Sequence, residues 1–284
     1  MIFAARDLGL GADAELRDRT QMQFLALLVR QGASRFVLKG GMAMRALYAS
    51  VRLTKDVDFD CENSVSQSSM QAQMPKALAQ AARLAGLSVI EVSQTKRADR
   101  SNRWRIRGTA AEGTAVNWEV EVSRRGLPPA DFIETRAFEA PLDYRIPNFS
   151  VRVYDSAAMA GGKVNALLSD NRSVPRDVYD LSVLARHGAD PTPLWLRCVP
   201  RETLEGKRDA VMAKIERIDF ALANAELLPF LAPSVRDGFD ARRWDEIRLT
   251  VAERVEKWIE QAIPRARTAK ELNRDPDDAD FAGR

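Results

Sequence analysis

Apolar and polar residues follow a helical period at the start of the chain and a strand period soon after it. Between Asp13 and Gln31 the apolar residues form a broad stripe among charged positions, which predicts an amphipathic helix. Strands are predicted over Arg35–Leu38 and Asp56–Cys61, the second because polar and apolar residues alternate strictly along it. A second helix is predicted between these strands, over Met42–Ser50.

The middle of the chain continues with short elements. An alanine-rich segment predicts a helix over Lys76–Ala85, and a short strand follows over Leu87–Val92. Two further segments, Arg103–Arg107 and Val116–Val122, alternate with period two across a loop that contains glycine, and they predict a hairpin.

From Asp155 onward helical patterns dominate. Helices are predicted, with proline-containing breaks between them, over Asp155–Leu168, Pro175–Arg186, Arg201–Leu228 and Ala241–Ile263. The predicted fold class is therefore α+β. A mixed sheet with helices is expected in residues 1–150, an all-helical region in residues 151–272, and a short polar tail in residues 273–284.

Composition narrows the class of protein. With 45% hydrophobic and 29% charged residues, the 284-residue chain has an ordinary globular composition, and its net charge of +3 points to no overall affinity for nucleic acid. Cys61 and Cys198 form no CxxC pair and thus indicate neither a zinc site nor a disulfide framework. Because no apolar run reaches the length of a membrane span and no signal peptide is evident, we expect a cytoplasmic protein without a membrane partner.

Candidate chemistry is concentrated between residues 36 and 60. A predicted strand ends in Gly40 and Gly41, where the backbone can approach a ligand closely and free N–H groups at a helix start can hold phosphate. The next strand carries Asp56, Asp58 and Asp60 on one face, because strand side chains alternate. Three neighbouring carboxylates repel one another unless cations lie between them, and Mg²⁺ prefers such oxygens.

A second acidic strand is expected to complete this site. Two-metal phosphoryl chemistry usually draws a carboxylate from another strand, and Val116–Val122 carries Glu119 and Glu121 on one face. The spacing favours neither glutamate over the other.

These motifs resemble the AbiEii/AbiGii-type nucleotidyltransferase toxins, within the nucleotidyltransferase superfamily. The resemblance spans roughly residues 35 to 185. It rests on Leu38-Lys39-Gly40-Gly41, Asp56-Val57-Asp58-Phe59-Asp60, Glu121-Val122-Ser123, Lys163, Arg172 and Arg176-Asp177-Val178-Tyr179-Asp180-Leu181.

The resemblance implies a nucleotidyltransferase fold in the N-terminal half and a role for each motif. Asp56, Asp58 and Glu121 would bind two Mg²⁺ ions, with Mn²⁺ as the alternative metal. Lys163 would neutralise the charge of the triphosphate, and Asp177 would orient that lysine or contact the nucleotide. Lys39, Gly40, Gly41 and Arg176 complete the nucleotide-binding residues that the resemblance implies.

Simpler interpretations accompany these roles. A helical lysine such as Lys163 is usually solvated, and Asp177 lies in a first helical turn, where carboxylates are favoured by the helix dipole alone. The chain also departs from the family pattern, with glutamate in place of the usual aspartate at Glu121 and with Gly161-Gly162 before the lysine. Two glycines inside a helix cost roughly 2 kcal/mol relative to alanine, so they either admit a ligand or lie before the helix start.

Basic residues gather near the predicted hairpin. Arg103, Arg105 and Arg107 share one strand face, and Lys96, Arg97 and Arg100 precede them. The arginines either pair with Glu119 and Glu121 across the strands or line the path of an RNA backbone.

The function that the resemblance implies is metal-dependent transfer of a nucleotide from a nucleoside triphosphate to an acceptor. The acceptor would be RNA, with tRNA as a candidate, and the chain would be the toxin of a toxin–antitoxin pair with a cognate antitoxin protein as partner. The alternative is a catalytically inactive nucleotide- or RNA-binding regulator with the same fold.

Overall fold

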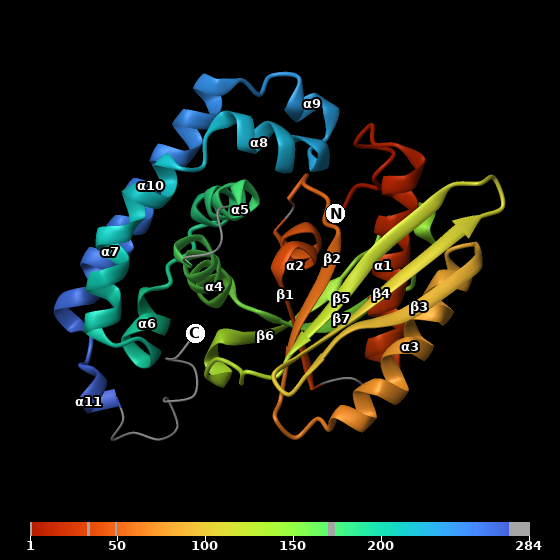
Figure 1. Ribbon diagram of the computed structural model, residues 1–284, viewed down its shortest axis with the longest axis horizontal. Coiled ribbons are helices and arrows are strands. Elements are labelled where there is room, and N and C mark those ends of the chain that lie inside the picture. Colours follow the sequence, from red (N-terminus) through yellow and green to blue (C-terminus); the bar gives the residue numbers. More distant parts are fainter. Residues whose placement is uncertain (1, 33–34, 49, 170–173, 273–284) are drawn as a thin grey trace. The chain divides into compact units, whose positions relative to one another are not determined.

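A computed structural model of the chain (Figure 1) describes residues 2–32, 35–48, 50–169 and 174–272. The contacts divide the chain into two compact units. Unit 1 comprises Met1–Leu127, Glu134–Val153 and Ala232–Ser234, and unit 2 comprises Pro128–Ile133, Tyr154–Leu231 and Val235–Arg284. The predicted polar tail, residues 273–284, lies outside the described residues.

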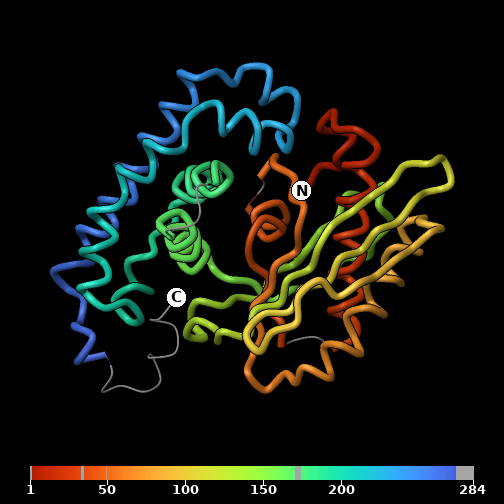
Figure 2. The backbone as a smooth tube through the Cα atoms, in the orientation of Figure 1, coloured from red at the N-terminus to blue at the C-terminus, as the bar shows by residue number. Residues whose placement is uncertain are grey.

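Unit 1 is built on a seven-stranded mixed sheet with the strand order β3-β4-β5-β2-β1-β7-β6. Strand β2 pairs parallel with β5, β1 pairs parallel with β7, and β3, β4 and β5 form an antiparallel meander that can be followed in Figure 2. The bounds are β1 Phe36–Lys39, β2 Asp56–Cys61, β3 Leu87–Ala98, β4 Ser101–Ala110, β5 Ala115–Ser123, β6 Ile133–Phe138 and β7 Phe149–Tyr154.

Helices α1 (Ala12–Arg30) and α3 (Gln67–Leu84) pack together against one face of this sheet. Phe24 of α1 meets Phe59 of β2 and Trp118 of β5 edge to face, with ring centroids 6.4 and 5.7 Å apart. Because strand side chains alternate, the residues between these aromatic side chains point to the opposite face. The acidic residues of β2 and β5 therefore lie on the face of the sheet opposite α1.

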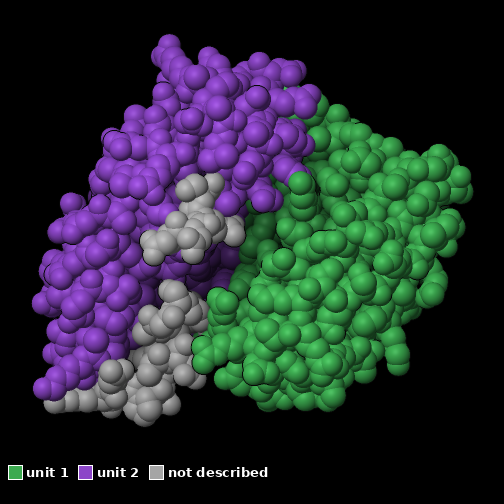
Figure 3. Space-filling model, in the orientation of Figure 1, with its two compact units in different colours: residues 1–127, 134–153, 232–234 green, residues 128–133, 154–231, 235–284 purple. Residues whose placement is uncertain are grey.

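Unit 2, purple in Figure 3, is mainly helical. Its long helix α10 packs along α5 and α7, and the buried indole of Trp244 donates a hydrogen bond of 2.8 Å to the carbonyl of Ile218. The helices are α4 Ser156–Leu168, α5 Pro175–Arg186, α6 Thr192–Cys198, α7 Arg201–Glu216, α8 Phe220–Glu226, α10 Ala241–Ala262 and α11 Ala269–Leu272. The short helix α9, Pro233–Arg236, has two residues in each unit. Together the two units confirm the α+β fold class.

Several element bounds differ from the sequence-based prediction. Helix α3 begins at Gln67, well before the predicted Lys76, because Ser66 caps it and buried Met70 and Met74 extend its apolar stripe. Strand β3 continues to Ala98, beyond the predicted end at Val92. Its outer half pairs with β4 but is largely exposed, so the sequence there shows no alternation.

Among the described residues, two strands and the three short helices α6, α9 and α11 were not predicted, and one helix was predicted too long. Strands β6 and β7 (bounds above) join the sheet, and β7 pairs with β1 through Val153 and Leu38. Helix α6 forms although Pro193 lies in its first turn, where a missing N–H costs no hydrogen bond. The helix predicted over Arg201–Leu228 is divided after Glu216, because Asp219 caps the separate helix α8.

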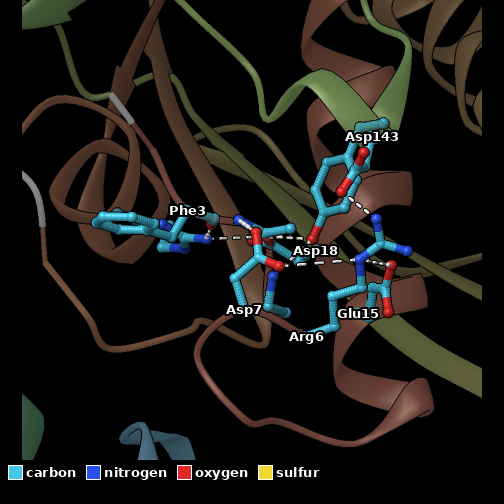
Figure 4. Close-up of polar contacts among 10 residues, drawn as sticks. Phe3, Arg6, Asp7, Glu15, Asp18 and Asp143 are labelled. Atoms are coloured by element: carbon cyan, nitrogen blue, oxygen red, sulfur yellow. Dashed lines mark hydrogen bonds and ion pairs between the residues drawn. The ribbon is translucent and has the colours of Figure 1, made fainter.

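A polar cluster holds the N-terminal segment against α1 and α2 (Gly40–Leu47) (Figure 4). The buried carboxylate of Asp18 accepts hydrogen bonds from Arg45 at 3.2 Å and from the hydroxyl of Tyr144 at 2.9 Å. The same hydroxyl accepts from the backbone N–H of Ala5 at 3.0 Å, and Arg45 also donates to the carbonyl of Phe3. Arg45 is therefore a structural residue of unit 1.

None of the helices within the described ranges has both the length and the apolar character needed to cross a bilayer.

Candidate active site

The backbone between β1 and α2 passes close to the acidic strand. Gly40 has a φ of +68°, a left-handed conformation that favours glycine, and a Cβ at this position would lie 2.3 Å from Oδ2 of Asp58. A Cβ at Gly41 would lie 2.5 Å from the hydroxyl of Thr54. Both glycines are therefore required by close packing, and the start of α2 lies directly beside the carboxylate of Asp58.

The carboxylates of β2 differ in their surroundings. Asp56 and Asp58 are partly exposed, whereas Asp60 is buried and accepts a hydrogen bond of 2.8 Å from the amino group of Lys39. In the register of the sheet, Lys39 lies opposite Asp58. Lys39, which the sequence suggests as a nucleotide-binding residue, is thus placed as the counter-ion of Asp60, and Asp56 and Asp58 remain as the accessible acidic pair.

Strand β5 brings the two glutamates next to this pair. Asp56 is opposite Glu119 and Asp58 is opposite Glu121 in the parallel register of β2 and β5. The sheet therefore assembles all four carboxylates on one face, as the sequence predicts.

The arginines of β4 cover these glutamates. Arg103 donates from Nε to Glu121 at 3.1 Å and also from a terminal nitrogen, while Ser101 donates to the other carboxylate oxygen at 2.8 Å. Arg105 donates from Nε to Glu119 at 2.8 Å. The cross-strand ladder, one of the two interpretations of these arginines, is therefore present in the structure.

The ladder affects the ionisation of Glu121. Burial acts to raise its pKa, but the hydrogen bonds from Arg103 and Ser101, together with the positive charges of Arg103 and Lys96, outweigh burial, and the pKa of Glu121 lies below its ordinary value. The hydrogen bond with Glu121 likewise raises the pKa of Arg103. The third arginine, Arg107, lies further along β4, and its guanidinium is 3.7 Å from Glu91 on β3.

The fit of these residues to a divalent metal is uneven. Asp56 and Asp58 supply the hard oxygen ligands that Mg²⁺ or Mn²⁺ requires. Gly40 approaches Asp58 so closely that a side chain at position 40 would collide with the carboxylate. Both carboxylate oxygens of Glu121 already accept hydrogen bonds. In the described part of the chain, no group of three or more His, Cys, Asp or Glu residues is arranged to hold a metal ion.

Unit 2 contains a separate charged cluster between α4 and α5. The amino group of Lys163 lies 2.9 Å from Oδ1 of Asp177 and 2.7 Å from Oδ2 of Asp180. The Lys163 side chain is only 13% exposed, and the two aspartates are buried. Lys163 is thus not a solvated lysine, and Asp177 does more than complement a helix dipole. The sequence leaves the roles of Asp177 and Asp180 open, and in the structure both aspartates pair with the lysine.

The two glycines before Lys163 lie within helix α4, which begins at Ser156 with Asp155 as its cap. A Cβ at Gly161 would lie 3.2 Å from Leu194 and 3.3 Å from the indole nitrogen of Trp195, both on α6, whereas Gly162 faces open space. Gly161 therefore allows α4 and α6 to pack closely.

Arg176, a predicted nucleotide-binding residue, lies with its guanidinium carbon 5.4 Å from the ring centroid of Phe230. Arg172, which belongs to the motif in the helical half, lies outside the described residues.

Several solved structures share the fold of this chain. The chain is 16% identical to JHP933 from Helicobacter pylori over 93% of this chain and 98% of that one, with a TM-score of 0.56. A putative nucleotidyltransferase from H. pylori matches with 16% identity over 89% and 98% of the two chains and a TM-score of 0.56. The nucleotidyltransferase toxin MenT4 from Mycobacterium tuberculosis H37Rv matches with 20% identity over 93% and 98%, with a TM-score of 0.50. These likenesses establish the nucleotidyltransferase fold.

The family follows from the sequence as a whole. The model of the nucleotidyl transferase AbiEii toxin family, of type IV toxin–antitoxin systems, matches residues 25–275. Because this match covers most of the chain, the chain belongs to the AbiEii nucleotidyltransferase toxin family, and its class of activity is nucleotidyl transfer. The resemblance found in the sequence motifs is thereby confirmed. No curated protein matches the chain.

Proposed function

We propose that the chain transfers a nucleotide from a nucleoside triphosphate to an RNA acceptor, tRNA being the candidate, in a reaction that depends on a divalent metal. The observation that carries this proposal is the junction of β1 and α2, where the Gly40 backbone lies against Asp58, two residues along β2 from Asp56. A phosphate held by the N–H groups of this junction would lie next to the two carboxylates.

Each part of the junction has a chemical task. The N–H groups at Gly40 and Gly41 bind phosphate oxygens, and Asp56 and Asp58 hold Mg²⁺ or Mn²⁺ close to them. When bound, the ion neutralises triphosphate charge and polarises the phosphoryl group under attack. Lys39 keeps the buried carboxylate of Asp60 neutralised, so that β2 presents only Asp56 and Asp58 to the ion.

The reaction itself breaks a phosphoanhydride bond of the triphosphate and forms a phosphodiester bond. A hydroxyl oxygen of the RNA forms a bond to the α-phosphorus and loses its proton to solvent, while the bond from the α-phosphorus to the bridging oxygen breaks and pyrophosphate leaves.

For unit 2 we propose that Lys163 binds phosphate oxygens of the nucleotide. Its side chain is held by Asp177 and Asp180, so the ammonium group is positioned before the ligand arrives. Arg176 has a guanidinium already stacked on Phe230, and we propose it as a further contact for the nucleotide.

The proposed acceptor contacts are the basic residues around the β3–β4 hairpin. The sequence suggests RNA contacts at Arg103, Arg105 and Arg107, but all three arginines take part in ion pairs. Lys96, Arg97 and Arg100 are exposed at the end of the same hairpin, and we propose that they contact RNA phosphates.

The family further suggests a cognate antitoxin as partner, and we propose that the protein acts as a toxin in the cytoplasm.

The test is direct incorporation of nucleotide. The protein is incubated with total RNA, Mg²⁺ and each labelled nucleoside triphosphate in turn, and label in RNA is measured. We expect one or more nucleotides to be incorporated and incorporation to stop when the metal is chelated. Asp58→Asn should lower the rate at least about a hundredfold, whereas Asp237→Asn, the same charge change on an exposed residue, should not. Nucleotide binding without incorporation by the unaltered protein would instead favour the regulator alternative.

A further inference from the structure

Glu121 lies where a third metal ligand is expected, yet its carboxylate is fully engaged by protein donors. Arg103 donates to Oε2 of Glu121 from Nε at 3.1 Å and from a second guanidinium nitrogen, and Ser101 donates to Oε1 at 2.8 Å. Both bonds from the guanidinium go to the same oxygen, Oε2, and hydrogen bonds between oppositely charged groups are among the stronger ones in proteins. An ion that bound both oxygens of Glu121 would displace these donors.

The charges beside Asp56 and Asp58 are also balanced by the chain itself. Arg103 reaches both glutamates, since its Nη1 lies 3.5 Å from Glu119, and Arg105 pairs with Glu119 as well. Two glutamates thus face two arginines within the ladder. The guanidinium of Arg103 is a fixed cation at the position where a second metal ion would otherwise offset the glutamates.

We propose that this site binds a single divalent ion, through Asp56 and Asp58, and that Arg103 takes the place of the second ion. In this arrangement Glu121 is a positioning residue that holds Arg103. A dication at Glu121 would lie beside the Arg103 guanidinium, and the repulsion between them opposes its binding. The proposal rests on the proposed function only in assigning the ion to Asp56 and Asp58.

The decisive measurement is Mn²⁺ binding to the full chain, which requires no turnover. Free Mn²⁺ is followed by electron paramagnetic resonance during a titration, with and without a non-hydrolysable nucleoside triphosphate analogue. We expect the unaltered protein to bind a single ion, and Asp58→Asn to weaken binding at least about tenfold. Glu121→Gln should change the Kd less than about threefold, like the matched variant Glu119→Gln.

Arg103→Gln gives the sharpest contrast. Removing the guanidinium frees Glu121, so this variant should bind a second ion or bind the first at least about tenfold more tightly. If Glu121→Gln or Arg103→Gln alone fails to fold, the double variant removes both charges together, and it should still bind a single ion with a Kd close to that of the unaltered protein.

Three results overturn the inference: two ions in the unaltered protein, loss of an ion or a tenfold loss of affinity in Glu121→Gln, or no Mn²⁺ binding at all. Failure of the inference and failure of the proposed function are distinguishable. A protein that binds one ion but incorporates no nucleotide retains the inference without the function. A protein that incorporates nucleotide but loses an ion in Glu121→Gln retains the function alone.

Discussion

Gly40 and Asp58 are in contact across the first two strands of the sheet, so closely that a Cβ on Gly40 would lie 2.3 Å from the carboxylate oxygen Oδ2. No side chain fits in this space without moving Asp58. The contact joins the start of α2 to the acidic strand, and therefore fixes the backbone N–H groups of this helix start and the carboxylate relative to each other.

Gly40→Ala should accordingly abolish nucleotide transfer while the protein remains folded. The methyl group displaces Asp58, and the positive φ adds about 1–2 kcal/mol of backbone strain. Gly32→Ala is a matched control, because Gly32 has a φ of +74° but no atom within 4 Å of its Cβ position. Both variants carry the cost of the positive φ in a urea titration, Gly40→Ala adds the cost of the clash with Asp58, and only Gly40→Ala should lose activity and Mn²⁺ affinity. Equal activity in the two variants would show that the contact with Asp58 has no functional role.

Lys163→Ala should affect both stability and catalysis. It removes the cation shared by the buried carboxylates of Asp177 and Asp180, and breaking a buried pair in this way costs about 3–5 kcal/mol. The KM for nucleotide should rise and turnover should fall, while Lys163→Arg should restore both only in part, because a planar guanidinium cannot occupy the same position. Urea denaturation and steady-state kinetics measure the two effects. An alanine variant with unchanged kinetics would leave Lys163 with a structural role alone.

The salt dependence of RNA binding separates the two groups of basic residues. Replacing Lys96, Arg97 and Arg100 by alanine should weaken RNA binding and reduce the slope of log Kd against log salt by about one unit for each lost phosphate contact. Replacing Arg103 and Arg105 should instead lower the melting temperature, because it leaves Glu119 and Glu121 without their arginines, and should leave the slope unaltered. The reverse pattern would assign the RNA path to the ladder arginines. Filter binding at several salt concentrations, together with thermal melts, distinguishes these outcomes.

At alkaline pH the free energy of unfolding should depend on the ionisation of Cys61. Burial raises the pKa of this thiol to about 11 in the folded chain, whereas an unfolded thiol ionises near pH 8.5. The unfolded state therefore binds fewer protons between these values, and the free energy of unfolding should fall with rising pH by up to about 1.4 kcal/mol per unit. The contribution is fully present below the unfolded pKa and is lost as the pH approaches 11. Urea denaturation at several pH values should show the stability advantage of the unaltered protein over Cys61→Ala shrinking across this window, and a constant difference would contradict the assignment.

Much of the site could be predicted because its chemistry is local in the chain. The strict alternation of Asp56–Cys61 places its three carboxylates on one face of the strand wherever the strand lies in the fold. Gly40 and Gly41 directly follow the strand Phe36–Lys39 in the sequence. The same alternation placed Glu119 and Glu121 together on β5. These features depend on periods of two residues, which the sequence displays directly.

The strands that the sequence did not predict lack such a period. Strand β7 joins the sheet through parallel pairing with β1, more than a hundred residues earlier in the chain, and nothing near Val153 signals that partner. The outer half of β3 is a strand only because β4 pairs with it, and its exposed residues carry no apolar pattern. Prediction of strands from propensity and pattern therefore failed where pairing with a strand distant in the sequence decided the structure.

The sequence by itself determined which residues could carry the chemistry, namely the glycine pair, the Asp56 and Asp58 carboxylates, the glutamates of β5 and the basic residues near the hairpin. Only the tertiary structure decided how their charges are matched. It placed Arg103 on Glu121, Lys39 on Asp60, and Lys163 between Asp177 and Asp180. Each pair joins side chains from different strands or helices, and ion pairing depends on distances of a few ångströms, which the register of a sheet and the packing of helices set and the order of residues does not.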